Sequence, residues 1–533
     1  MSTPQSESLG QAITALRPRL MGAVPIVCPI LSGLQVRETT NALVAGEADI
    51  DLGRVVSLLT LNRILAPQPL YQVEAWLAET VLPQVLDIAP EKVYDNRLGR
   101  ALDRLYPHLG ELWASLASRA VQVYGLDLNV LHWDITSIYF EGAYTDSELA
   151  TYGYSRDHRP DTKQVNLELD VTHEGYVPIL YQVLAGNTAD ITQPLPHLQA
   201  LLRFLARPEL AGRHLRPLLV SDSKLVTPEA VLAYRRHRLF YLGPLPNGKA
   251  TEALLQSVSK EELAAHSLAY RPQRVKADDP TFIAYQGVWR SFSFEAEGQR
   301  VTDRALVVWS AGKQHLDEQK RKTYLKRLLG GLAHIQKKLN TYRYKKRLYV
   351  EQRLAAVQQG NPTKGLVDID LTGEDGALKL SFRINRQKLA EVQRLDGRYA
   401  VVTNADHLSA DEALGLFKGR DGVEKRIGVV KGPLLVHPLF VRTDRRIEGL
   451  IFITLLALLV RAILERACRQ RGLAVTADRL LQGFGVLQAL DLTWSDGSLQ
   501  RRASEMTAFQ AQVLRALGWP EPSTYACLAP IMH

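Results

Sequence analysis

The sequence contains very little cysteine. Its 533 residues include only Cys28, Cys468 and Cys527, which lie far apart and form no Cys-x-x-Cys pair. A disulfide framework and a cysteine-ligated zinc site are therefore not expected. So few cysteines fit a reducing compartment such as the bacterial cytoplasm.

Long apolar runs and targeting signals are also lacking. The N-terminus has no basic stretch followed by an apolar core, so no signal peptide is expected. The longest apolar run, Gly449 to Val460, is shorter than the roughly 20 residues that cross a bilayer. It predicts a helix buried inside the protein, and no membrane partner is expected.

What the chain does contain is an excess of positive charge. Lys and Arg number 65 against 56 Asp and Glu, which gives a net charge of +9 and a pI near 9.2. This balance suits a polyanion partner such as nucleic acid, although many enzymes are mildly basic. A hydrophobic content of 46% is ordinary for a globular protein with about three or four domains.

The first 125 residues have mainly helical periodicity. Apolar residues recur at three- and four-residue spacing in Leu52 to Leu65 and in Leu70 to Leu86. Two interpretations remain open, a small helical bundle and a helical module that recognises DNA ends.

From residue 126 to 243 the pattern changes to a mixed α/β unit. Val130 to Phe140 predicts a strand, and residues 162 to 186 predict two strands joined at His173 to Gly175, the first of them half-buried. Leu215 to Asp222 predicts another strand, and Thr227 before Pro228 predicts a helix start. This order predicts antiparallel strands followed by helix-crossed parallel strands in one mixed sheet.

Residues 244 to 395 interrupt this unit with a strand-rich part and a long charged helical region, Lys313 to Gln358. Basic residues alternate there with tyrosines, which suits a DNA backbone surface. A solvated helical hairpin that bends near Gly330 and Gly331 explains the pattern equally well. A strand returns at Leu395 to Asp406, and helical sequence is expected from there to the end.

Two aspartates are unusual in their strands. Asp134 stands in an apolar and aromatic strand, and Asp222 ends the apolar strand Leu218 to Val220. Carboxylates at such positions on neighbouring strands can hold hard cations through oxygen. The alternative is that each aspartate caps the turn or helix that follows it.

A third carboxylate lies in a spaced set of four residues. Phe417, Arg420, Glu424 and Lys431 are separated by three, four and seven positions, which predicts one shared face of a helix. Gly432 and Pro433 predict the end of that helix. Charge spacing alone also fits a solvated face with i,i+4 ion pairs.

This set resembles the signature Tyr-(2)-Arg-(3)-Glu-(6)-Lys of a large group of DDE insertion-sequence transposases. Every spacing agrees, and the departure is Phe417 in place of Tyr. Four upstream stretches are also similar to this group, and the resemblance covers roughly residues 125 to 465. In chain order these stretches are WDITSIYFEG, YSRDHRPDTKQVNLEL, LAGNTADITQ and LLVSDSKL.

The resemblance implies a ribonuclease H-like core in which Asp134, Asp222 and Glu424 converge on two divalent cations, Mg²⁺ or alternatively Mn²⁺. Asp134 would bridge the two ions. The implied reaction is hydrolysis at the ends of an insertion sequence, followed by attack of the freed 3′-hydroxyl on target DNA.

The same resemblance implies DNA contacts and a domain plan. Arg420 and Lys431 would face phosphates, and Phe417 leaves stacking possible. Apart from the resemblance, the cluster Tyr154 to Arg159, which includes Arg156 and His158, is either another DNA contact or a loop with internal salt bridges. The expected partners are terminal inverted repeats and target DNA, bound by a homodimer in the bacterial cytoplasm at the nucleoid. The expected parts are 1–125 for DNA-end recognition, 126–243 for the first part of the core, 244–395 for an insertion, 396–470 for core completion and 471–533 for a helical C-terminal segment.

Three alternatives stay open from the residues. One is a nuclease on the same core without strand transfer, and another is a non-catalytic DNA-binding relative of a transposase. A glycoside hydrolase with two carboxylates is the third, but that class does not explain Arg420 and Lys431 beside Glu424.

Overall fold

The protein is a mixed α/β chain with a large mixed sheet and many helices. The computed structural model describes residues 13–46, 48–157, 159–213, 215–222, 226–271, 284–434 and 441–527. The chain divides into two compact units, the first made of Met1–Val220 with Gly419–His533 and the second of Ser221–Lys418. Each unit is described by itself below. The expected domain boundaries remain a prediction.

The N-terminal part of the first unit is largely helical, as expected. The predicted helix over 70–86 is interrupted, because Glu79 to Val81 bond instead to the backbone of Leu20. The helices are α1 (Val24–Gly33), α2 (Val36–Leu43), α3 (Leu52–Leu65), α4 (Val73–Ala78), α5 (Leu82–Leu86), α6 (Asp95–Leu105) and α7 (Leu109–Tyr124), with 3-10 turns at Leu70–Gln72, Pro90–Lys92 and Tyr106–His108.

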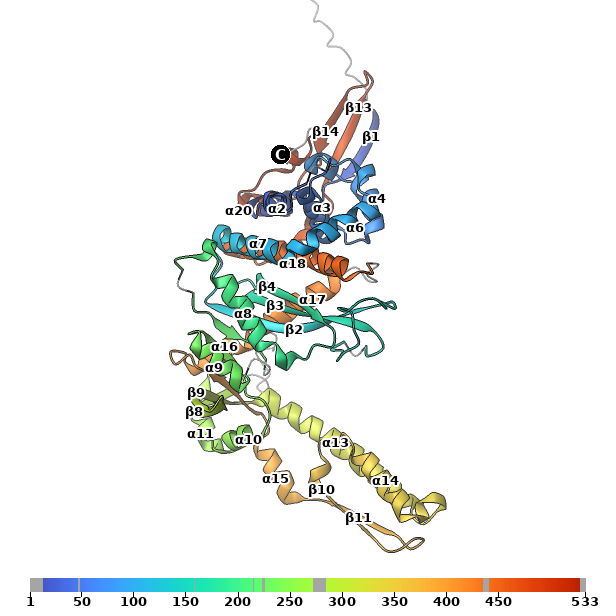
Figure 1. Ribbon diagram of the computed structural model, residues 1–533, viewed down its shortest axis with the longest axis vertical. Helices are drawn as coiled ribbons and strands as arrows, with labels where there is room; N and C mark the ends of the chain where they lie inside the picture. Colours follow the sequence, from blue (N-terminus) through green and yellow to red (C-terminus); the bar gives the residue numbers. More distant parts are fainter. Residues whose placement is uncertain are drawn as a thin grey trace, which may run out of the picture. The chain divides into compact units, whose positions relative to one another are not determined.

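The ends of the chain meet in a three-stranded antiparallel sheet of order β1-β13-β14 (Figure 1). Its strands are β1 (Ile13–Leu20), β13 (Gln488–Trp494) and β14 (Leu499–Ala503). The expectation of a purely helical C-terminal segment was therefore wrong. Helices α19 (Ala477–Phe484), α20 (Ala508–Leu517) and α21 (Pro522–Tyr525) flank these strands. Strand propensity depends strongly on pairing context, and the central strand β13 pairs both with its neighbour β14 and with β1, more than 460 residues away.

The core sheet of the first unit has the order β4-β3-β2-β5. Strand β2 (Val130–Phe140) is antiparallel to β3 (Lys163–Thr172) and parallel to β5 (Leu218–Val220), and β3 is antiparallel to β4 (Pro178–Ala185). Helix α8 (Pro194–Leu205) follows the 3-10 turn Asp190–Thr192, and Pro208–Leu210 forms another such turn. The predicted mixed sheet is confirmed within this unit.

Strand β3 is buried on both faces. Its apolar residues were expected to face a core, and its polar residues to face water. Instead Gln164, Asn166, Glu168 and Asp170 are at most 3% exposed. Alternating polarity therefore does not mark a solvent-facing strand here, and these polar groups need partners inside the protein.

Helix α18 (Asp444–Gln470) is the central helix of the first unit. It packs against α1, α3, α6, α7 and β4, and lies beside α7 next to the sheet (Figure 1). It is long and apolar enough to cross a membrane, but 94% of its most apolar window is buried inside the protein. It therefore fits the core helix that the apolar run predicted.

The second unit contains an antiparallel sheet of order β6-β12-β9-β8-β7. The strands are β6 (Phe240–Pro244), β7 (Ser267–Leu268), β8 (Tyr285–Ala296), β9 (Gln299–Ser310) and β12 (Arg398–Thr403). The predicted start of α9 is confirmed, since the Thr227 side chain accepts a hydrogen bond from the Ala230 amide. The accompanying helices are α9 (Pro228–Arg236), α10 (Lys249–Gln256), α11 (Lys260–Ala264), α15 (Arg386–Arg394) and α16 (Ala410–Lys418).

Residues 311 to 384 form what we call the arm. Helices α13 (Ala311–Lys338) and α14 (Arg347–Gln358) pack against the hairpin of β10 (Val367–Thr372) and β11 (Lys379–Ile384), with short 3-10 turns at Tyr342–Lys345 and Lys364–Leu366. Within the second unit, the arm runs away from β8 and β9 (Figure 1). The chain reverses at residues 339 to 346. The expected bend at Gly330 and Gly331 was wrong, because both lie within α13.

Candidate active site

Asp134 lies in the middle of β2, in the first unit. It is partly buried, and its Oδ1 accepts a hydrogen bond from the Ile135 amide at 2.8 Å. Pairing places Asp134 opposite Leu169 of β3. Asp134 therefore shares a sheet face with apolar neighbours, on the opposite side of the sheet from the buried polar residues of β3.

The segment with the predicted signature is not one continuous helix. Helix α16 ends at Lys418, the chain turns at Gly419 and Arg420, and α17 (Asp421–Val429) begins afterwards. A π-helical turn, Val430–Leu434, then carries Lys431 and Pro433. The prediction of four residues on one helical face was therefore wrong, because Gly419 and Pro433 favour breaks in the helix.

Helix α17 is held against the core sheet by close packing. It packs on β2 and β3, and the Arg426 side chain donates hydrogen bonds to the carbonyls of Gly175 and Tyr176. A Cβ at Gly422 would lie 1.9 Å from the Tyr176 ring, so this position requires glycine. Packing thus compensates for the weak helix propensity of this glycine-containing segment.

Glu424 lies on this helix with its side chain half exposed. Its Oε1 lies 3.4 Å from Arg420 Nη2, and the side-chain exposures are 52% and 27%. This is the i,i+4 pair that the sequence also allowed. Glu424 and Asp134 therefore belong to one unit, on two elements that pack together.

Lys431 contacts a residue of the YSRDHRPD stretch. Its Nζ lies 2.8 Å from both carboxylate oxygens of Asp157, and both side chains are largely buried. Two separate stretches that carry the resemblance therefore meet through this ion pair. His158, the next residue, lies outside the described residues.

Arg156 also has a carboxylate partner inside the protein. It forms a salt bridge with Asp190, and its amide donates to Ser137 Oγ at 3.2 Å. Asn166 accepts a further hydrogen bond from Arg156 at 3.4 Å and donates to the carbonyl of Thr188. These bonds make Arg156 a link between β2, β3 and the LAGNTADITQ stretch, which favours the alternative of a salt-bridged loop.

Two further buried polar residues of β3, Glu168 and Asp170, lie in a second cluster with His197 of α8. His197 Nε2 lies 2.9 Å from both carboxylate oxygens of Asp170, and the His197 ring stacks on Trp133 at 4.4 Å between ring centres. Burial lowers the pKa of His197, but the attraction of Asp170 exceeds this effect, so the net pKa is raised. Asp170 and His197 therefore form a buried hydrogen-bonded pair.

Glu168 stands beside this pair without a hydrogen-bond partner among the described residues. Both of its carboxylate oxygens are buried. Burial raises the pKa of Glu168 to about 7, with further contributions from Asp170 and Asp190, against the attraction of His197. Asp190, Asp170 and His197 were not among the predicted site residues, and only Asp170 had a local signal, the polar alternation of β3.

His132 lies on the face of β2 that also carries Asp134, opposite the face of Trp133, and it is close to Arg420. Its Nε2 lies 2.9 Å from His173 Nδ1. Burial, with the charges of His173 and Arg420, lowers the pKa of His132 to about 3. The two imidazoles are therefore neutral at pH 7 and leave the positive charge here to Arg420.

Asp222 and Phe417 belong to the second unit. Asp222 follows β5 and is partly buried. The Phe417 ring centre lies 6.2 Å from that of Tyr399. The Lys418 ammonium lies 5.3 Å from the Tyr399 ring centre and 5.9 Å from that of Phe417. Phe417 is thus part of a small aromatic cluster of the second unit.

The ligand chemistry of these carboxylates suits a hard cation. Asp134 and Glu424 offer the oxygen atoms that Mg²⁺ prefers, and Glu424 is accessible to solvent. Among the described residues, no three His, Cys, Asp or Glu side chains form a group that could hold a metal ion. The first unit by itself therefore offers two candidate ligands, Asp134 and Glu424.

The chain is similar to one described family and to a solved structure. Residues 18–118 match a family described as "Domain of unknown function (DUF4277)". No curated protein matches the chain. Among solved structures, the chain is similar to one titled "Cryo-EM structure of piggyBac transposase synaptic complex with hairpin DNA", with 8% identity over 87% of this chain and 78% of that chain. The TM-score is 0.36, and so low a value carries no conclusion about fold or activity.

Proposed function

We propose that this protein is a DNA transposase of the DDE type, with Asp134, Asp222 and Glu424 as its metal-binding carboxylates. The observation that carries the proposal is the spacing of Arg420, Glu424 and Lys431, in a segment whose helix α17 carries Glu424 and packs against β2, the strand of Asp134. Asp222 enters the proposal on its sequence motif alone.

Two features of the first unit support this proposal. The order β4-β3-β2-β5, with β2 parallel only to β5, agrees with the ribonuclease H-like core that the resemblance implies. The contacts of Arg156 with Asp190, and of Lys431 with Asp157, join stretches that the resemblance had marked separately. A shared architectural role explains why these stretches occur together.

The proposed chemistry assigns a role to each side chain. Two Mg²⁺ ions, or Mn²⁺, would activate the attacking oxygen and stabilise the leaving oxygen of each phosphoryl displacement. Asp134 and Glu424 would orient these ions from β2 and α17. Arg420 would offer a forked donor to a phosphate beside the cut, and Lys431 would offer a point charge. Phe417 offers an aromatic face and no hydroxyl.

The proposed partners are the inverted repeats of an insertion sequence and a target duplex. Bringing two ends together makes a homodimer the expected assembly, acting on the nucleoid in the cytoplasm. Residues 1–125 are the proposed end-recognition module.

The test is an assay with Mg²⁺, a plasmid target and labelled duplexes copied from inverted repeats that flank the gene. The full chain should cut the ends and join them to the plasmid. Glu424→Gln should lower both products at least 100-fold and leave end binding within about twofold, because the amide keeps the shape but loses the charge that holds a cation.

Lys425→Gln is the matched control, since Lys425 is the exposed neighbour of Glu424 on α17. It should retain cleavage. Cleavage without joined product would mean a nuclease, and full activity of Glu424→Gln would remove Glu424 from the site.

A further inference from the structure

The arm contains a long stretch with charge of only one sign. Between Glu318 and Glu351 there is no acidic residue, while eleven Lys and Arg side chains occur. These cations are Lys320, Arg321, Lys322, Lys326, Arg327, Lys337, Lys338, Arg343, Lys345, Lys346 and Arg347.

The two faces of α13 have opposite character. Leu328, Leu332 and Ile335 point into an apolar core shared with α14 and the β10–β11 hairpin. At 3.6 residues per turn, Lys326 and Lys337 fall on the opposite side of the helix, and both are exposed. The core thus orders the helix, and the packing leaves its cations in solvent.

Most of these cations have no carboxylate partner among the described residues. Arg321, Lys346 and Arg347 pair with Asp396, Asp375 and Glu351. The other eight form no salt bridge within the part of the chain that the structure describes. Repulsion between unpaired like charges is a cost that a polyanion would relieve.

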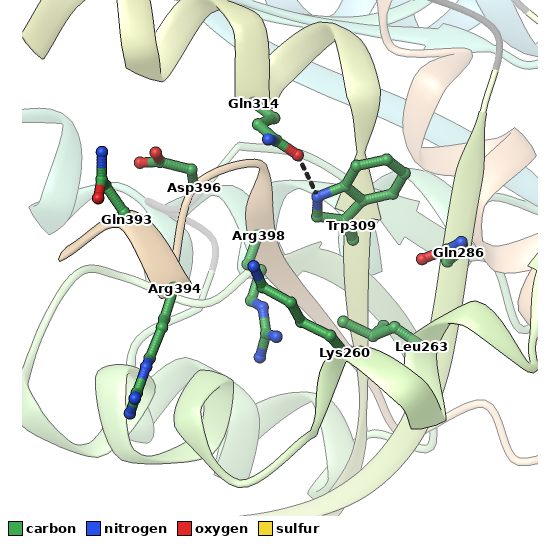
Figure 2. A pocket seen from close by; sticks show the side chains of 9 residues that line it. All are labelled: Lys260, Leu263, Gln286, Trp309, Gln314, Gln393, Arg394, Asp396 and Arg398. Carbon is green, nitrogen blue, oxygen red and sulfur yellow. Dashed lines mark hydrogen bonds between the residues drawn. The ribbon is translucent and has the colours of Figure 1, made fainter. Parts of the chain in front are cut away.

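The base of the arm is anchored to the sheet of the second unit. Arg321 makes a bidentate salt bridge with Asp396, with two N–O distances of 2.6 Å. The Trp309 indole of β9 donates to Gln314 of α13 at 3.0 Å, beside a pocket of about 150 Å³ (Figure 2). The arm is therefore braced at its base.

The tip is braced as well, and it presents an aromatic ring. Asn340 bonds through its amide group to both the carbonyl and the amide of Leu378, at 3.0 and 2.8 Å. Tyr342 lies in this turn at φ +41°, with 94% of its surface exposed, next to Arg343. An exposed ring on an ordered turn is a surface on which a base or sugar can stack.

We propose that the arm binds double-stranded DNA, with the exposed cations of α13 on phosphates and Tyr342 against the sugar–phosphate backbone at the tip. A helix of 28 residues is about 42 Å long, close to one turn of B-DNA, about 34–36 Å. The run of exposed cations without acidic residues favours a nucleic acid over a protein partner. The identity of the partner as DNA rests on the proposed function.

The experiment compares two triple variants of the full chain in binding a fluorescent 40-base-pair duplex of arbitrary sequence at several salt concentrations. Lys326→Gln, Arg327→Gln and Lys337→Gln remove three arm cations. Arg471→Gln, Arg479→Gln and Arg515→Gln remove three exposed cations of the first unit. Each lost phosphate contact should reduce the slope of log K against log salt by about 0.9.

We expect the arm variant to lose at least tenfold in affinity at low salt and two to three units of slope, and the control to stay within twofold. Tyr342→Ala should weaken binding about fivefold with an unchanged slope, because a ring carries no charge. Melting curves that match the wild type would exclude unfolding as the cause.

Equal affinity and slope for the arm variant and the control would overturn the proposal. So would an arm variant that loses binding to polyglutamate or RNA but keeps binding to the duplex. If the wild type never cuts DNA but the arm variant still loses duplex affinity, only the proposed catalytic function fails. If the wild type cuts and the slopes are equal, only this inference fails.

Discussion

The core sheet and the arm use the same cationic residue types in opposite surroundings. In the core, Arg156 and Lys431 are largely buried, and each contacts a carboxylate. In the arm, Lys326 and Lys337 are exposed without such a partner among the described residues. Paired, buried cations maintain architecture, and unpaired, exposed ones remain available to a polyanion, so charge alone does not assign a role.

The largest difference in stability between core and arm variants is expected at the Asp170–His197 pair. Asp170→Ala should lower the free energy of unfolding by about 3–5 kcal/mol, because it removes the hydrogen-bond partner of the buried His197 imidazole and leaves a cavity. The arm control Lys326→Gln should change it by less than about 0.5 kcal/mol. Urea denaturation of both variants measures the difference, and equal small effects would contradict the contrast.

A smaller effect is expected at Glu168, whose pKa of about 7 lies above its ordinary value of 4.5. Between these values the folded state binds more protons than the unfolded state, so stability falls as pH rises through this window, by up to roughly 3 kcal/mol. Glu168→Gln should be more stable than the wild type at pH 8 and nearly equal at pH 4.5. Melting temperatures across pH 4.5–8 test this, and parallel curves would show that Glu168 does not titrate there.

The smallest effect is expected at Lys431. It is paired with Asp157, like the other core cations, but would also bind DNA if it reaches a phosphate. Asp157→Asn would release its ammonium and should strengthen binding to DNA ends about threefold, while Lys431→Ala should weaken it to a similar extent. Titration of labelled ends at two salt concentrations distinguishes these changes. If Asp157→Asn weakens binding instead, the Asp157–Lys431 pair is architectural like that of Arg156.

Local patterns predicted much of the fold. The strand from Val130 to Phe140 has the predicted bounds, and the Thr227 cap starts α9 as expected. Such features depend on neighbours within a few residues, through alternation or a capping bond. For the candidate site, the local spacing of Arg420, Glu424 and Lys431 was visible, but the break between α16 and α17 was not.

By itself, the sequence determined the strand of Asp134, the helical segment of Glu424 and the one-signed charge of the arm. Only the tertiary structure decided which charges are neutralised. Lys431 and Asp157 are 274 positions apart, and the polar face of β3 is buried because α8 brings His197 onto it. Such partners depend on long-range packing, which cannot be predicted from a residue's neighbours in the sequence.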